Sequence, residues 1–133
     1  MSLVREVRLV RSADGVHRIA QRPVLPADTD GLSVFELSAP AAPGDRHAIV
    51  LSGDDDERLV ITVDGDDRSI TCDRTLSGRT DFHAGFPSVD WAPLPVGTVG
   101  AVDLTIVVDG MIVEIYAGGG LVTMTEQVFP REP

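Results

Sequence analysis

Residues 102–116 read VDLTIVVDGMIVEIY, and this stretch decides the fold class. Two β-branched runs, Val102–Val108 and Met111–Tyr116, flank the dipeptide Asp109-Gly110. This order is the strongest short-range signal for a β-hairpin, because a two-residue type I′ turn needs positive φ at both central positions. Asp64-Gly65 follows another β-branched run in the same way, so the sequence predicts a second hairpin of this kind.

The rest of the chain repeats this pattern of short apolar runs separated by Gly, Asp and Pro, and hardly any segment shows a helical period. The expected strands are Val4–Arg11, Val16–Val24, Ser33–Ala39, His47–Ser52, Arg58–Val63, Ser69–Arg74, Val102–Val108, Met111–Tyr116 and Leu121–Phe129. A long irregular segment is expected between the sixth and the seventh of these. The pattern predicts an all-β protein, a two-layer antiparallel β-sandwich of jelly-roll or concanavalin-like type.

Composition supports one soluble domain over residues 1–133. The chain has 43% hydrophobic residues, enough for a core of its own, and a formal net charge of −10, which disfavours nucleic acid and anionic membrane as partners. No apolar run approaches the ~20 residues of a membrane helix, and no signal peptide opens the chain, although residues 1–3 resemble a start added for expression. All 11 basic residues are arginine, which favours a GC-rich bacterial source. Cytoplasmic and secreted locations both stay open.

The sequence predicts no metal site and no cofactor. Asp28-Thr29-Asp30-Gly31 resembles the centre of an EF-hand loop, but Pro26 and Leu37 stand where the first and last calcium ligands should be. The acidic turn Asp54–Glu57 is expected to be a solvated hairpin tip. The single cysteine, Cys72, is expected to be a small buried side chain rather than a nucleophile.

The densest polar segment is residues 73–83, DRTLSGRTDFH. As an active site it is weak, because its serine lacks the Gly-x-Ser-x-Gly elbow and only three histidines exist to act as a base. Long loops also need charge-assisted hydrogen bonds, since their backbone groups lack partners in a sheet. We therefore expect a structural role for Asp73, Arg74, Ser77, Asp81, Phe82 and His83.

Two single residues have alternative interpretations. Trp91 stands in the segment expected to be irregular, where it would serve as an exposed platform for a sugar ring or as an apolar plug at the end of the sandwich. Glu114 is the one acid in an apolar strand and faces the same way as Ile112 and Tyr116. It would be an acid catalyst with a raised pKa or, as we expect, an edge or surface residue paired with an arginine.

Taken together, these segments resemble the C-terminal domain of glycoside hydrolase family 32, the β-fructofuranosidases, invertases and levanases. Asp73–Gly78 and Asp81–His83 are similar to the family's DRSxSG…DFH signature, and Leu104–Pro130 is similar to its closing pattern, LxIfVDxSsVEVFxNdGxxxxTxxxFP. Val4–Leu9 and Ala20–Val24 resemble its PREL and QxPV segments. The family's serine pair in the terminal hairpin is Gly-Met here. The terminal-hairpin positions that match the pattern are Asp109, Glu114 and Tyr116.

The resemblance implies a β-sandwich that follows a five-bladed propeller, in which an aspartate nucleophile and a glutamic acid/base cleave fructosides with retention. The propeller motifs Asn-Asp-Pro-Asn, Arg-Asp-Pro and Glu-Cys do not occur in this chain, so it should be inactive alone. Its expected partners are its own N-terminal propeller and other copies in an oligomer. The 73–83 loop would brace the sandwich at its contact with the propeller.

The alternative that the resemblance leaves open is a carbohydrate-binding module for fructan or sucrose. In that case Trp91 is the expected sugar contact.

Overall fold

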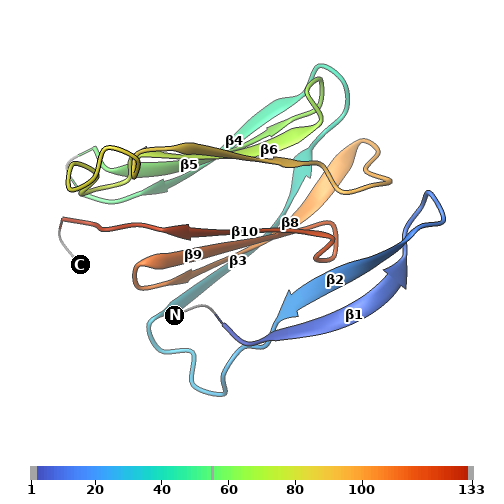
Figure 1. Ribbon diagram of the computed structural model, residues 1–133, viewed down its shortest axis with the longest axis horizontal. Coiled ribbons are helices and arrows are strands. Elements are labelled where there is room, and N and C mark those ends of the chain that lie inside the picture. Colours follow the sequence, from blue (N-terminus) through green and yellow to red (C-terminus); the bar gives the residue numbers. More distant parts are fainter. Residues whose placement is uncertain (1–2, 55, 132–133) are drawn as a thin grey trace.

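The computed structural model describes residues 3–54 and 56–131, and within them ten strands form three antiparallel sheets (Figure 1). The strands are β1 Arg5–Arg11, β2 His17–Pro23, β3 Leu32–Pro40, β4 Arg46–Ser52, β5 Arg58–Asp64, β6 Ser69–Leu76, β7 Val89–Pro93, β8 Ala101–Asp109, β9 Ile112–Ala117 and β10 Val122–Gln127. The expected start at residues 1–3 and the expected acidic turn at 54–57 include residues 1, 2 and 55, which lie outside the described residues.

Two four-stranded sheets make the sandwich, which confirms the fold predicted from the sequence. Sheet I has the order β10-β9-β8-β3 and sheet II the order β4-β5-β6-β7. Alternate residues of both sheets point inward, and burial stabilises each large apolar side chain by roughly 1.5–3 kcal/mol. Cys72 lies in this core and burial raises the pKa of its thiol, so it is packed as a small hydrophobe. The largest core side chains, each at most 2% exposed, are Ile61, Ile70, Leu104, Ile106 and Ile115.

Strands β1 and β2 form a separate two-stranded sheet, which lies against sheet I as a third layer (Figure 1). The backbone N–H of Gln21 in β2 donates to the carbonyl oxygen of Gly120 at 3.0 Å, next to the start of β10. An isolated two-stranded hairpin is marginally stable in water. The hairpin therefore depends on its contacts with sheet I.

Strand β7 lies in the segment that the sequence analysis left irregular, so the expected position of Trp91 in a loop is wrong. Trp91 sits in the middle of β7, opposite Thr71 of β6. The strand has only five residues and ends in Pro93. Proline cannot donate to a sheet and signals a break, but β7 is an edge strand, where proline is tolerated.

Both Asp-Gly hairpins are present, but neither has the expected type I′ turn. After β8 the turn residues are Gly110 and Met111, and only Gly110 has a positive φ, +56°, which is the type II′ pattern. After β5 the loop has four residues, 65–68, and its positive φ, 50°, falls on Arg68. Here Asp64 shapes the loop, because its Oδ1 accepts the backbone N–H groups of residues 66 and 67 at 2.9 Å.

The contact between the hairpin and sheet I can be tested at two neighbouring glycines. Gly119 and Gly120 have φ values of 69° and 90°, so alanine at either position costs about 1–2 kcal/mol of conformational strain. A Cβ on Gly120 would also overlap the carbonyl group of Gln21, whereas a Cβ on Gly119 would meet no atom within 4 Å. We expect Gly120→Ala to lower the melting temperature clearly more than Gly119→Ala in thermal unfolding followed by circular dichroism. Equal losses would show that β2 does not press on this turn.

Candidate functional site

The polar loop predicted at residues 73–83 has an inner half that serves the fold. Asp73, on β6, accepts the backbone N–H of Thr75 at 2.9 Å and its hydroxyl at 2.6 Å. Ser77 is 6% exposed, and its Oγ donates to the carbonyl oxygen of Arg74 at 2.8 Å. The serine proton is held by a backbone carbonyl, so Ser77 is not arranged as a nucleophile.

Arg74 is the centre of an inter-sheet cluster formed by Arg74, Phe86, Ser88, Asp90 and Glu126. Its Nε donates to Ser88 Oγ at 2.8 Å, and its guanidinium carbon lies 4.3 Å from the centre of the Phe86 ring. Its Nη1 lies 3.7 Å from Glu126 Oε2. Because Arg74 belongs to β6 and Glu126 to β10, this contact joins sheet II to sheet I.

Glu126 is the member of this cluster whose carboxylate is buried without enough hydrogen-bond partners. It is 2% exposed, and its Oε2 has no hydrogen-bond partner among the described residues. Burial, followed by the neighbouring Asp90 carboxylate, raises the pKa of Glu126 to about 7, while Arg74 opposes this shift. Glu126 is therefore protonated in the folded protein in part of the pH range in which an ordinary glutamate is charged.

The outer half of the loop is exposed and begins at Arg79. The N–H of Arg79 donates to the carbonyl oxygen of Phe129 at 2.8 Å, which ties the loop to the C-terminal segment. Asp81 and His83 lie at the surface, and His83 Nδ1 accepts the N–H of Gly85 at 3.0 Å. Phe82 is 59% exposed. The loop thus braces the fold through its first residues and presents its last residues to solvent.

Glu114 belongs to a second polar cluster, which holds the β1–β2 hairpin. It is 1% exposed, accepts a hydrogen bond from Arg5 Nη2 at 3.1 Å and another from the Tyr116 hydroxyl at 2.8 Å. Arg5 also donates to Thr125 Oγ1 at 2.8 Å and to Gln21 Oε1 at 3.1 Å. Burial, and then the bond to Glu114, raises the pKa of Tyr116 to about 12. We call these five residues the hairpin clamp.

The expected arginine partner of Glu114 is confirmed, but its expected place at an edge or on the surface is wrong. Strand β9 lies between β8 and β10, and the hairpin covers the outer face of sheet I at this point. The identity of this partner, Arg5, is not marked in the sequence around Glu114. The two residues are 109 positions apart, and no local pattern links them.

The two remaining predicted positions, Asp109 and Trp91, belong to neither cluster. Asp109 is the last residue of β8, opposite Ile112, and closes the terminal hairpin. Trp91 is 63% exposed on edge strand β7. Its ring is not a plug in the sandwich, and it remains available for a ligand or a neighbouring domain.

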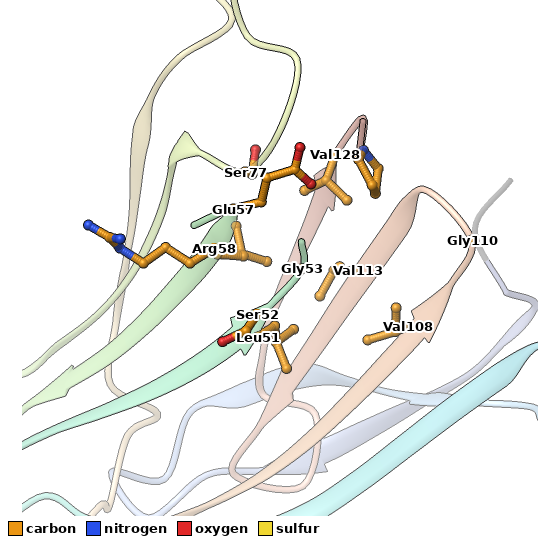
Figure 2. A pocket seen from close by; sticks show the side chains of 12 residues that line it. Leu51, Ser52, Gly53, Glu57, Arg58, Ser77, Val108, Gly110, Val113 and Val128 are labelled. Atoms are coloured by element: carbon orange, nitrogen blue, oxygen red, sulfur yellow. The ribbon is translucent and has the colours of Figure 1, made fainter. Parts of the chain in front are cut away.

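A cavity of about 140 Å³ opens between the two sheets at one end of the sandwich (Figure 2). Its walls are mainly apolar, with Leu51 from sheet II opposite Val108 and Val113 from sheet I. Glu57, at its rim, is 6% exposed and accepts the backbone N–H of Arg131 at 3.0 Å. The volume of the cavity is well below the ~300–1,000 Å³ usual for ligand sites. We therefore interpret it as an incompletely packed end of the core.

These arrangements do not make a glycosidase centre. A retaining glycosidase places two carboxyl groups against the sugar, but Glu114 and Glu126 are only 1% and 2% exposed, so no sugar reaches either. Among residues 3–54 and 56–131, no three His, Cys, Asp or Glu side chains lie close enough together to hold a metal ion. Within the same residues we find no helix with the length and hydropathy needed to cross a bilayer.

Comparison with known proteins gives one consistent family. Residues 18–133 match the family described as glycosyl hydrolases family 32 C terminal. Similar sequences include extracellular exo-inulinases of Aspergillus awamori and Aspergillus ficuum, each 39% identical over 74 residues, which are 56% of this chain and 14% of each relative. The chain thus spans a small part of these relatives. They are fungal and do not support the bacterial source suggested by the arginine content.

Solved structures with the same fold point to the same family. The exo-inulinase from Aspergillus awamori superposes with a TM-score of 0.75 and 25% identity, over 98% of this chain and 30% of that one. Sucrose-6-phosphate hydrolase from Lactobacillus gasseri superposes with a TM-score of 0.65 and 26% identity, over 94% of this chain and 28% of that one.

The raised pKa of Glu126 predicts that stability falls as pH rises. The folded state keeps the proton up to a pKa of about 7, whereas the unfolded chain releases it near the ordinary value of 4.5. The unfolding free energy should therefore decrease between these values, by up to about 3 kcal/mol, and level off above them. Glu126→Gln mimics the protonated form, so it should unfold at higher denaturant concentration than the parent at about pH 8 but not at about pH 5.

The matched control is Glu36→Gln, which alters an exposed glutamate on β3 and should leave the difference between the two pH values unchanged. The raised pKa of Glu126 would be contradicted if, compared with Glu126→Gln, the parent chain became more stable between about pH 5 and about pH 8.

Proposed function

The chain belongs to glycoside hydrolase family 32, of which it is the C-terminal domain, and on this premise we propose that it is a non-catalytic module that stabilises the N-terminal catalytic domain of a β-fructosidase. The parent enzyme would hydrolyse sucrose or fructans with retention, in the propeller that the family resemblance implies. The observation that carries this proposal is an exposed apolar surface on the β1–β2 hairpin.

This surface, the hairpin patch, consists of Val7, Leu9 and Ile19. The three side chains share one face of the hairpin, with Leu9 directly opposite Ile19, and are 59%, 71% and 57% exposed. The far end of the hairpin extends past the edge of the sandwich (Figure 1). Neighbouring exposed apolar side chains of this kind are typical of a surface that meets another protein part.

Position along the chain favours the catalytic domain as the part that covers the patch. The family match begins at residue 18, inside β2, so β1 lies before it. The matched exo-inulinase chain is covered to only 30%, and the matched family is described as C terminal. On this basis the catalytic domain would precede β1, and the hairpin would be the first element that it meets. Interfaces between domains commonly bury 600–1,500 Å² in total.

The hairpin clamp would make this docking effective. Arg5 of β1 binds Glu114 of β9 and Thr125 of β10, so the hairpin is tied to two of the four strands of sheet I. A catalytic domain held by the hairpin would thereby be held by the whole sandwich.

The test uses the whole enzyme and the separate 133-residue chain. In the whole enzyme, Leu9→Asp should place a charge in the interface and shorten the half-life of activity on heating, by several-fold, because an unpaired buried charge is costly. The specific activity before heating should not change. In the separate chain Leu9 is exposed, so its melting temperature should stay within about 2 °C of the parent's.

Val50→Asp is the control for this experiment. Val50 is 49% exposed on β4, on the sandwich itself, and its substitution should have no effect on either protein. The proposal fails if Leu9→Asp leaves heat inactivation unchanged, or if the separate chain hydrolyses sucrose or inulin.

The exposed ring of Trp91 favours carbohydrate binding as a second candidate function. Its indole is open on β7 beside Thr71, an arrangement in which a ring stacks on a sugar and a hydroxyl donates to it. Titration of the chain with inulin, levan or sucrose should then quench tryptophan fluorescence, with loss of binding in Trp91→Ala. Absence of any response at millimolar sugar would leave the stabilising role alone.

A further inference from the structure

A pocket of about 530 Å³ lies beside the outer half of the 73–83 loop, and its volume falls within the ~300–1,000 Å³ range of ligand sites. We call it the loop pocket. Its walls come from three segments: the loop, the β8–β9 turn and the C-terminal segment. The lining residues are Arg79, Phe82, Met111, Phe129, Pro130 and Arg131.

The floor of the loop pocket is apolar and closely packed. Phe82 packs on Phe86 and Phe129 with ring centres 4.7 Å and 5.3 Å apart, and Phe86 lies under the Arg74 guanidinium. The loop also packs closely on the C-terminal segment at Gly78. This glycine has a φ of 130°, and a Cβ added there would overlap the backbone of Phe129. Although Phe82 is 59% exposed, its ring is held in place without a ligand. Such a site loses little conformational entropy on binding.

The polar side chains that line the pocket are two guanidinium groups, and no carboxylate lines it among the described residues. Arg79 forms no ion pair with any described side chain, whereas Arg131 is paired with Glu57 at 3.9 Å. In a chain of net charge −10, Arg79 thus gives the pocket a positive charge that no described carboxylate neutralises. Guanidinium groups only donate hydrogen bonds, so the complementary group is one that only accepts them, such as a phosphate.

The pocket is also separate from the hairpin patch. The loop and the C-terminal segment lie at one end of the long axis, and the tip of the β1–β2 hairpin lies at the other (Figure 1). The loop pocket and the hairpin patch therefore share no residues.

We propose that the loop pocket binds a phosphorylated sugar, with the sugar ring on Phe82 and the phosphate held by Arg79 and Arg131. The apolar floor requires a ligand with a ring or an apolar face, and the donor-only rim requires an anion on the same molecule. That the ring is a sugar rests on the proposed function. The charges call for an anion, and we choose phosphate because guanidinium groups bind it through paired hydrogen bonds.

The probe for this site is fructose 6-phosphate, added to the separate chain and followed by isothermal titration calorimetry and amide NMR shifts. We expect a dissociation constant below about 1 mM, at least about tenfold tighter than for fructose or inorganic phosphate. The shifted amides should include Arg79, Phe82 and Arg131. Raising NaCl from about 0.05 M to about 0.5 M should weaken the binding, because exposed charges are screened at high ionic strength.

Two substitutions separate the two halves of the site. Arg79→Gln should weaken fructose 6-phosphate binding about tenfold by removing a charge-assisted contact, and Phe82→Ala should weaken it several-fold by removing the ring platform. The matched controls are Arg68→Gln and Phe35→Ala, which remove an exposed arginine and an exposed aromatic ring outside the pocket. They should bind as the parent does.

Three outcomes would overturn the proposal. Equal affinity for inorganic phosphate, unaffected by Phe82→Ala, would show a simple anion site. Equal affinity for fructose, unaffected by Arg79→Gln, would show a neutral sugar site, and no binding at about 10 mM probe would show no ligand site of useful affinity. None of these results bears on the heat inactivation of the whole enzyme, so the stabilising role is tested independently.

Discussion

The ion pair between Arg5 and Glu114 is the interaction on which the three-layer arrangement depends. Glu114 is buried at 1% exposure under the hairpin, where an unpaired carboxylate would be very costly. Arg5 and Tyr116 supply a charge and a hydroxyl, so both carboxylate oxygens are satisfied. Removing one partner of a buried ion pair commonly costs 3–5 kcal/mol, mainly through the charge left behind. The pair thus stabilises the fold less by its own attraction than by making any displacement of the hairpin unfavourable.

In the inter-sheet cluster, by contrast, the buried carboxylate is not fully satisfied by its partners. Arg74 approaches Glu126 only to 3.7 Å, and the Asp90 carboxylate opposes the charge of the glutamate. Glu126 is buried beside Arg74 and the half-buried Asp90, and burial, followed by Asp90, raises the pKa of Glu126. The same residue types therefore form a satisfied clamp on one side of sheet I and a titrating contact on the other. Glu114 accepts hydrogen bonds on both carboxylate oxygens, whereas Glu126 Oε2 has no hydrogen-bond partner among the described residues.

The strand pattern was predictable because period-two alternation is a local property, and every expected strand has a counterpart within a few residues. Strand β7 was missed since it is short and ends in Pro93. The turn types were wrong because Asp64 and Asp109 end their strands rather than occupying the turn centres, and sequence alone does not fix that register. For the site, the signature at residues 73–83 pointed to the right loop. The partners of its residues, and Arg5 for Glu114, come from distant segments that local pattern does not connect.

The loop itself explains how one motif serves two purposes. Its inner residues stabilise the fold, since Asp73, Arg74 and Ser77 form hydrogen bonds with groups of the sandwich. This hydrogen-bonded inner half sets the direction in which the chain leaves the sheet and so places Arg79 and Phe82 at the surface. A ligand site built on a flexible loop would lose affinity to ordering, whereas here the ordering is supplied by folding. The buried polar contacts of this module are thus the reason that its exposed residues can form a pocket at all.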